Sequence, residues 1–230
     1  YRIVLDKEVG NHKLHKNVAI VCAGNKDSDK AIVNRMSTAT QSRLVHFNLT
    51  VDSDDWLEWA EESRIDYRIR AFIGFRPEML FNFNPNHSDN TFPTPRTYEF
   101  LSRLIKKFPN DVPAEKLPLM AGTIGEGAAI EFNSFIKIFE KLPSFEKILN
   151  NPTKTPVPDD DPSQLYAISS LIGEKVSLDT FEPVLKYIDR LPSEFQVITM
   201  KSIARIHPNV ASTKNPSYNK WLMDNAKKFF

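Results

Sequence analysis

The feature that most constrains the fold is a short unbroken apolar run, Val18 to Cys22, which ends abruptly at Ala23-Gly24-Asn25. Such a run is typical of a strand in a parallel sheet, because helices cover both faces of that sheet. Ligands of open parallel sheets bind just beyond the carboxyl ends of the strands. The run therefore predicts a buried strand, with Asn25 where a nucleotide phosphate or a catalytic water would lie.

A helix and a second strand are expected next. Asp27 to Asp29 carries helix-start chemistry, since acidic groups are favoured beside the positive end of the helix dipole. The helical pattern breaks at Thr38 to Ser42. Leu44 to Val51 is rich in β-branched and aromatic residues, which predicts a strand. Arg43 then lies at a helix-to-strand corner, an exposed position from which a long cation can reach outward.

After Val51 the sequence predicts helices and no further strand. Asp52 begins a strong helix start, and Thr94-Pro95 begins another, because Thr suits the N-cap and Pro the first helical position. Arg96 is then in the first turn of its helix, where a charged head can point at a ligand. Further helices are expected over residues 66–75, 128–142, 163–172, 178–191, 193–206 and 218–230.

Three loop segments have their own signals. Gly10-Asn11 favours a hairpin, and Asn150 to Pro162, with its prolines and acidic residues, is the best candidate for a linker. Gly122 to Gly127 resembles a phosphate loop only at first sight. No Lys-Ser or Lys-Thr follows it and no strand precedes it, so a turn at a helix start is the better interpretation.

Composition restricts the class of partner and the compartment. Thirty Lys and Arg against 29 Asp and Glu leave a net charge of +1, so bulk charge does not favour nucleic acid or an anionic membrane. The single cysteine, Cys22, is expected in the core strand as a small apolar residue, and one cysteine forms no internal disulfide. Without a signal peptide or a long apolar span, these features indicate a reducing cytoplasm.

The order of these motifs resembles the MoxR-like branch of the AAA+ ATPases, particularly its bacterial and phage members. The likeness rests on the strand ending in Ala-Gly-Asn, on Asp-x-Asp-x-Ala-x-Val-x-Arg-Met from Asp27, and on Ser-Arg-Leu-x-His-Phe from Ser42. Later stretches that resemble the same group are Phe92-Pro-Thr-Pro-Arg96, Gly125-Glu-Gly-Ala-Ala129 and Leu191-Pro-Ser-Glu-Phe-Gln196. The resemblance covers nearly the whole chain.

The resemblance implies a fold in three parts that is predominantly helical overall. Residues 1–51 would be the C-terminal half of an α/β nucleotide-binding base domain, residues 52–150 a helical lid, and residues 151–230 a C-terminal helical extension. Asn25 would be the sensor 1 residue, which positions the attacking water or contacts the γ-phosphate. Arg43 would be the arginine finger for the neighbouring subunit's nucleotide, with Arg35 as its rival, and Arg96 would be the sensor 2 cation of the lid. For Arg96, the alternative is a salt bridge to Glu99.

The front half of the ATPase site is absent from the sequence. No Gly-x-x-x-x-Gly-Lys-[Ser/Thr] loop occurs, and no apolar strand runs into Asp-Glu, although both are needed to hold ATP and Mg²⁺. The family forms homo-oligomeric rings, commonly hexamers, that use ATP to remodel protein partners in a chaperone-like way. We therefore expect a portion of such an ATPase that does not hydrolyse ATP alone and acts within a longer protein.

Other interpretations stay open. A chain that acts as a non-catalytic helical interaction module, or as a ring subunit without its own ATPase activity, also fits the residues. His12 and His15 lack a third metal ligand at matching spacing, so we expect solvated histidines and no metal site. The Asp159 to Asp161 run does not follow the calcium pattern of an EF-hand.

Overall fold

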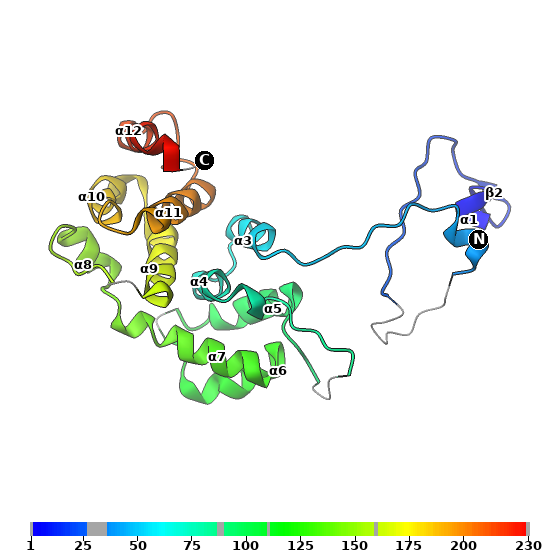
Figure 1. Ribbon diagram of the computed structural model, residues 1–230, viewed down its shortest axis with the longest axis horizontal. Helices are drawn as coiled ribbons and strands as arrows, with labels where there is room; N and C mark the ends of the chain where they lie inside the picture. Colours follow the sequence, from blue (N-terminus) through cyan, green and yellow to red (C-terminus); the bar gives the residue numbers. More distant parts are fainter. Residues whose placement is uncertain (1, 27–35, 87–89, 110, 159–160, 229–230) are drawn as a thin grey trace. The chain divides into compact units, whose positions relative to one another are not determined.

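The protein is described here by a computed structural model that covers residues 2–26, 36–86, 90–109, 111–158 and 161–228. The chain divides into two compact units. Unit 1 comprises Tyr1–Thr50 and Asn84–His87, and unit 2 comprises Val51–Phe83 and Ser88–Phe230. Helices dominate the fold (Figure 1), so the expectation of a predominantly helical chain is confirmed.

In the residues that the structure describes, unit 1 holds two short helices and one hairpin. The helices are α1 (Arg2–Leu5) and α2 (Thr38–Gln41), and the hairpin pairs β1 (Glu8–Val9) antiparallel with β2 (His12–Lys13). The turn is Gly10-Asn11, as predicted. Gly10 has a φ of +61°, which glycine adopts without the steric cost that a side chain imposes.

The two strands predicted for this unit from Val18 to Cys22 and from Leu44 to Val51 are not formed. Within the described residues the β1–β2 pair is the one sheet, and neither Val18 to Cys22 nor Leu44 to Val51 is assigned as strand. A strand exists only where a neighbour accepts and donates its ladder hydrogen bonds, and apolar composition alone does not supply that neighbour. Cys22, expected in a core, is exposed. The helix predicted from Asp27 falls mostly outside the described residues.

Unit 2 is built from helices joined by turns and loops. Its α-helices are α3 (Ser53–Glu62), α4 (Tyr67–Phe75), α5 (Pro95–Ile105), α6 (Leu117–Ile124), α7 (Glu126–Ile136), α8 (Phe145–Asn150), α9 (Pro162–Lys175), α10 (Leu178–Ile188), α11 (Ser193–Ile206) and α12 (Pro216–Asn225). Single 3₁₀ turns are η2 (Pro77–Met79), η3 (Ala114–Lys116), η4 (Phe139–Lys141) and η5 (Ala226–Lys228).

Local cap chemistry explains where several helices begin. The Asp52 carboxylate accepts from the backbone N–H groups of Asp54 and Asp55 at the start of α3. Thr94 forms a capping box with Thr97 at the start of α5, with Pro95 in the first turn, as predicted. Gly125, with a φ of +85°, separates α6 from α7, which confirms a turn at a helix start there.

Two predicted segments differ from the structure. The helix expected over 128–142 stops at Ile136 and continues as the η4 turn. The segment expected to be a linker is tied to α10 in its described part. Arg190 Nη1 donates to the carbonyls of Pro152 (2.6 Å) and Thr155 (2.8 Å), and the Tyr187 hydroxyl donates to Pro156 (2.9 Å). Its prolines therefore shape a packed loop.

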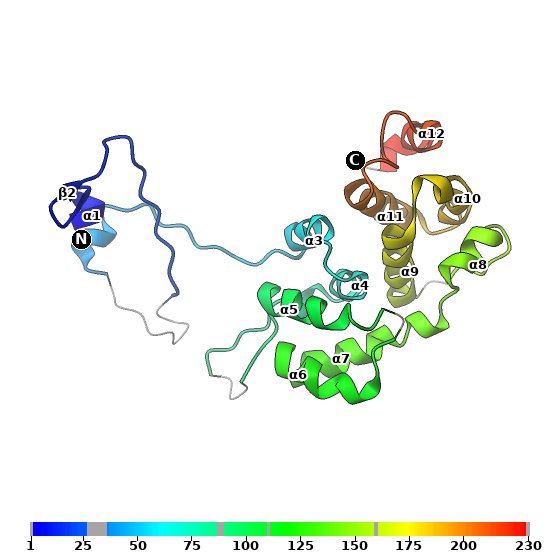
Figure 2. The ribbon, with the colours of Figure 1, turned by 180° about the vertical axis from the view of Figure 1, so that it is seen from behind.

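Unit 2 has two hydrophobic cores that meet at α9. Core 1 is formed mainly by α3 to α7 and includes the buried residues Trp56, Ile69, Phe72, Tyr98, Met120 and Phe132. Core 2 is formed by α8 to α12 and includes Ile148, Ile168, Phe181, Tyr187, Ile203 and Trp221. Helix α9 packs against α4 and against α11 (Figures 1 and 2), and it gives Ala167 to core 1 and Ile168 to core 2.

Candidate functional site

Asn25, the residue predicted to sense the γ-phosphate, lies in unit 1 in an irregular segment. Asn25 is exposed, as are the neighbouring residues Cys22 and Gly24. The amide of Asn both donates and accepts hydrogen bonds without adding charge. An exposed amide at this point is accessible to a ligand.

Arg43, the predicted arginine finger, follows the end of α2 and is also exposed. Its Nη1 donates to the backbone carbonyl of Ala39 at 2.6 Å. No carboxylate pairs with it in the described ranges of the chain. The guanidinium is therefore anchored at the C-terminal end of α2, and its charge is not neutralised there. The rival residue, Arg35, lies outside the described residues.

Arg96, the predicted sensor 2 residue, occupies the first turn of α5 and is exposed. The alternative partner, Glu99, instead makes an ion pair with Arg103 one turn further on. No hydrogen bond or ion pair of Arg96 is present in the part of unit 2 that the structure describes. A cation at a helix N-terminus is electrostatically disfavoured, so an anion bound there would relieve this cost.

These three residues belong to different units: Asn25 and Arg43 to unit 1, and Arg96 to unit 2. No hydrogen bond joins Asn25 to Arg43 among the residues described.

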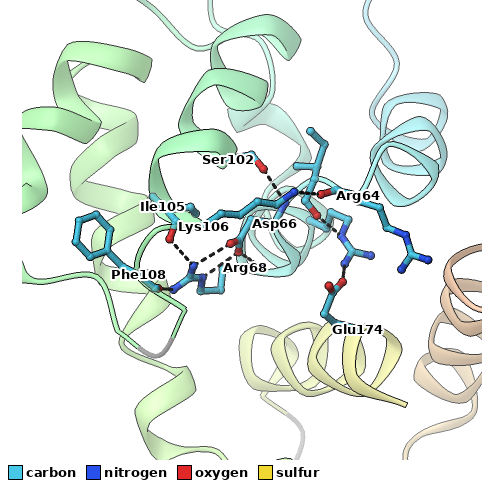
Figure 3. Close-up of polar contacts among 10 residues, drawn as sticks. Arg64, Asp66, Arg68, Ser102, Ile105, Lys106, Phe108 and Glu174 are labelled. Atoms are coloured by element: carbon cyan, nitrogen blue, oxygen red, sulfur yellow. Dashed lines mark hydrogen bonds and ion pairs between the residues drawn. The ribbon is translucent and has the colours of Figure 1, made fainter. Parts of the chain in front are cut away.

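A second polar arrangement, which sequence analysis did not identify, is buried at the start of α4 (Figure 3). Arg68 forms a two-pronged ion pair with Asp66, with Nε to Oδ1 at 2.9 Å and Nη2 to Oδ2 at 2.8 Å. Both side chains are about 95% buried, with exposed fractions of 4% and 5%. Arg68 also donates to the backbone carbonyls of Ile105 (3.0 Å), the last residue of α5, and of Phe108 (2.8 Å), beyond its end.

The Asp66 pair is electrostatically well compensated. Burial by itself lowers the pKa of the Arg68 guanidinium, but the hydrogen bonds and charge of Asp66 outweigh it, so that the pKa is raised. Asp66 in addition caps α4 by accepting from the Arg68 N–H, while its own N–H donates to the Ser102 hydroxyl at 2.9 Å. A buried charge with every main partner in place is a structural element rather than a reactive group.

Arg70, two residues on, links the two cores. Its Nε donates to the Ile65 carbonyl at 2.9 Å, and its Nη2 pairs with Glu174 of α9. Burial lowers the pKa of Arg70, and the charge of Glu174 offsets only part of that effect. Around this pair, Lys106 donates to the Arg64 carbonyl and Arg64 donates to the Ile206 carbonyl, which fastens α5 and α11 to the same turn.

Helical periodicity places the core residues of α4 correctly but does not reveal its buried arginines. Ile69, Phe72 and Ile73 are buried as their spacing predicts, yet Arg68 and Arg70 are buried too. The sequence feature that could have indicated these buried arginines is the excess of arginine over acidic residues in this segment. Residues 64–70 read Arg-Ile-Asp-Tyr-Arg-Ile-Arg, with three arginines and one acid, so partners have to come from distant segments.

Comparison with protein-family models, with curated protein sequences and with solved structures finds no match to this chain. Across the described helices, none is both long and apolar enough to cross a lipid bilayer. The described His, Cys, Asp and Glu side chains include no group of three or more that could hold a metal ion.

Proposed function

We propose that this chain is the carboxy-terminal portion of a MoxR-like AAA+ ATPase. In this proposal Asn25 is the sensor 1 amide, Arg43 is the arginine finger and Arg96 is the sensor 2 cation. The observation that carries it is Arg96, a cation in the first turn of α5 that is exposed while the adjacent Glu99 pairs with Arg103. A helix N-terminus with an unneutralised arginine is suited to a polyphosphate.

The apolar segments of unit 1 support the same proposal. Val21, Phe47 and Leu49 are 92%, 83% and 91% exposed, and Val45 is 81% exposed. Val45, Phe47, Leu49 and Val51 alternate with polar residues, which is the pattern of a strand with one buried face. Such side chains are costly to leave in water, so the proposal assigns these segments to a sheet completed by residues that this sequence does not contain.

The chemistry divided among these residues is positioning and charge stabilisation. Arg43 would stabilise the charge that develops on the transferred phosphoryl group of a neighbouring subunit's ATP, because guanidinium stays ionised and bonds in two prongs. Asn25 would orient the attacking water, and Arg96 would contact the nucleotide of its own subunit. The sequence contains no Gly-x-x-x-x-Gly-Lys-[Ser/Thr] loop and no apolar strand that runs into Asp-Glu, so the proposal assigns metal and triphosphate binding to residues outside this sequence.

The proposal also covers assembly and role. A finger that acts across a subunit boundary requires a homo-oligomer, and by resemblance this would be a hexameric ring in the cytoplasm. ATP turnover would be coupled to remodelling of a protein partner.

The first test is the intact mass of the natively expressed protein together with its MgATP hydrolysis. The proposal expects a mass above that of these 230 residues and measurable turnover. A mass equal to this chain and no turnover would favour the non-catalytic module instead.

The second test separates the roles by mutation. Arg43→Ala should lower kcat by ~10³- to 10⁵-fold with little change in nucleotide affinity. Arg96→Ala should weaken ATP binding by roughly 10- to 100-fold, because this is the loss of affinity expected when one hydrogen bond to a charged group is removed. Arg2→Ala and Arg103→Ala are matched controls, because both arginines are exposed and pair with surface glutamates.

A mixing experiment tests whether Arg43 acts in trans. Rings of Arg43→Ala subunits and rings of Asn25→Ala subunits should each be nearly inactive. After subunit exchange some interfaces join an intact Asn25 to an intact Arg43, so part of the turnover should return. No recovery after proven exchange would rule out the finger assignment.

A further inference from the structure

A groove of about 460 Å³ lies in unit 2 where core 1 meets core 2. It is enclosed by the start of α4, the segment after α5, η4, the start of α8 and the end of α9. Its volume is in the ~300–1,000 Å³ range of ligand pockets, which is room for a few residues of an extended chain. Neither Asn25, Arg43 nor Arg96 lines it.

The floor of the groove is apolar. Val112, Ile136, Phe145 and Leu171 are buried beneath it, and Phe139 and Leu142 are only half-buried. Both half-buried residues pack against the two cores at once. The Tyr67 ring meets the Phe139 ring edge to face at 5.4 Å between centroids. The aromatic pair offers a surface on which aliphatic stems can lie.

One of the two cations that line the groove is neutralised within the fold. Arg68, at its edge, is held by the Asp66 carboxylate at 2.8 Å. The other, Lys175 at the end of α9, is exposed and makes no ion pair within the described parts of the chain, and neither does Glu146 at the start of α8. The pKa of Glu146 is lowered first by a hydrogen bond from its own backbone N–H and then by the positive charge of Lys175.

Two carboxylates on the rim are left without a cation. Asp111 and Glu140 are both exposed, and neither makes an ion pair within the described parts of the chain. The charge of Asp111 acts on Arg68, but Arg68 spends its hydrogen bonds on Asp66 and on two backbone carbonyls. Three exposed carboxylates at the rim, Asp111, Glu140 and Glu146, thus outnumber one exposed lysine. The groove combines an apolar floor with a surplus of negative charge at its rim, which is complementary to an apolar segment with a cationic side chain.

We propose that this groove binds a short extended segment of a partner protein in which an apolar side chain stands next to lysine or arginine. The apolar side chain covers Phe139 and Leu142. The methylene stem of the cation lies over the Tyr67 and Phe139 rings, and its charged head reaches Asp111 and Glu140. This function needs no nucleotide and does not depend on the proposed ATPase activity.

The test uses the 230-residue chain, ¹⁵N-labelled, and two probes: the acetylated, amidated tripeptides Leu-Lys-Phe and Leu-Glu-Phe. Chemical-shift titration should place the Leu-Lys-Phe site at the backbone amides around Asp111, Glu140 and Leu142. Leu-Glu-Phe should bind more weakly by at least roughly threefold, and added salt should reduce the difference.

A charge-removal variant gives the sharper comparison. Asp111→Asn/Glu140→Gln should weaken Leu-Lys-Phe binding by roughly three- to tenfold and abolish the preference over Leu-Glu-Phe. Asp179→Asn/Glu182→Gln is the matched control, because these exposed carboxylates of α10 do not line the groove. All four substitutions are on the surface, and amide peak dispersion verifies that each variant is folded.

Three results would overturn the proposal: no shift up to the solubility limit of the peptide, shifts centred elsewhere on the chain, or equal binding of the two peptides. An unchanged affinity in Asp111→Asn/Glu140→Gln would do the same, because the rim carboxylates are the selective element.

Discussion

At the scale of single residues, the Asp66–Arg68 pair shows how a buried charge is tolerated. Arg68 has a carboxylate on one side and two helix-end carbonyls on the other, so its desolvation is matched by strong hydrogen bonds. The carbonyls belong to Ile105, the last residue of α5, and to Phe108 just after it, and the Ile105 carbonyl also accepts from the Phe108 N–H at 2.8 Å. One side chain thus satisfies groups from two helices.

Removal of this arginine should be severely destabilising. Arg68→Met leaves the Asp66 carboxylate buried and unpaired, and we expect the free energy of unfolding to fall by ~3–5 kcal/mol. Urea denaturation measures it. Arg103→Met, which breaks an exposed pair on α5, is the control and should cost at most about 0.5 kcal/mol. A loss below about 1 kcal/mol in Arg68→Met would contradict the role assigned to the pair.

The cap that Asp161 forms on α9 should make the stability of the fold depend on pH. Asp161 caps α9, and hydrogen bonds from Ser163 lower the pKa of its carboxyl below the ordinary 3.8, with burial acting in the opposite direction. A carboxyl whose pKa is lower in the folded state than in the unfolded state stabilises the fold when the pH is above its unfolded-state pKa. This stabilisation is lost as the pH falls through the folded-state pKa. Near neutral pH, the free energy of unfolding of the wild type should exceed that of Asp161→Asn by about 0.3–1 kcal/mol. The two unfolding curves should converge in acid, and a constant difference would contradict the prediction.

At the scale of elements, glycines set how closely α9 approaches its neighbours. A Cβ on Gly173 of α9 would lie 2.6 Å from the Ser202 Oγ and 3.1 Å from its Cβ on α11. A Cβ on Gly74 of α4 would lie 2.9 Å from the ring of Tyr166 on α9. Both glycines occur in helices, where they cost stability, because the close packing on each side of α9 leaves no room for a side chain.

Two glycine-to-alanine substitutions should therefore change the free energy of unfolding in opposite directions. Gly173→Ala should lower the free energy of unfolding by ~1–3 kcal/mol through overpacking, and Ser202→Gly in the same chain should restore part of it. Gly122→Ala in α6 meets nothing within 4 Å and should raise stability by ~0.5–1 kcal/mol. Chemical denaturation measures both. Destabilisation in Gly122→Ala would show that helix propensity does not govern that position.

At the scale of the whole molecule, α9 joins two cores into one folded unit. It contributes buried residues to both cores, and Arg70 and Glu174 pair across the α4–α9 contact. Because α9 belongs to both cores and its Glu174 pairs with the buried Arg70 of α4, the stability of core 1 is coupled to that of core 2. Unit 2 should therefore unfold in one cooperative transition.

Hydrogen exchange can test this coupling. Phe132→Ala removes a fully buried ring from core 1 and should cost ~3–5 kcal/mol. Because the cores are coupled, the slowest amides of α11 in core 2 should lose the same amount of protection as those of α7. Phe100→Ala, at an exposed site, should change neither. Unchanged protection in α11 would mean that the cores open independently.

Sequence reasoning succeeded where structure is local. The caps at Asp52 and Thr94, the Gly10-Asn11 turn and the start of α11 at Ser193 depend on residues within one turn of each other. For the candidate site, sequence reasoning identified Asn25, Arg43 and Arg96 from the order of the motifs, and all three residues are exposed in the structure. Their catalytic roles remain predictions that the kinetic experiments address.

The sequence by itself determined that this chain is mostly helical and where most of its helices begin, because these properties follow from periodicity and cap chemistry along the chain. Only the tertiary structure decided which charges are buried. Arg68 and Arg70 are inside because α5 and α9 bring carbonyls and a carboxylate to them, and Asp111 and Glu140 share a groove because distant segments meet there. Leu44 to Val51 has the composition of a strand and is not one here, because ladder hydrogen bonds need a neighbouring strand that composition does not provide.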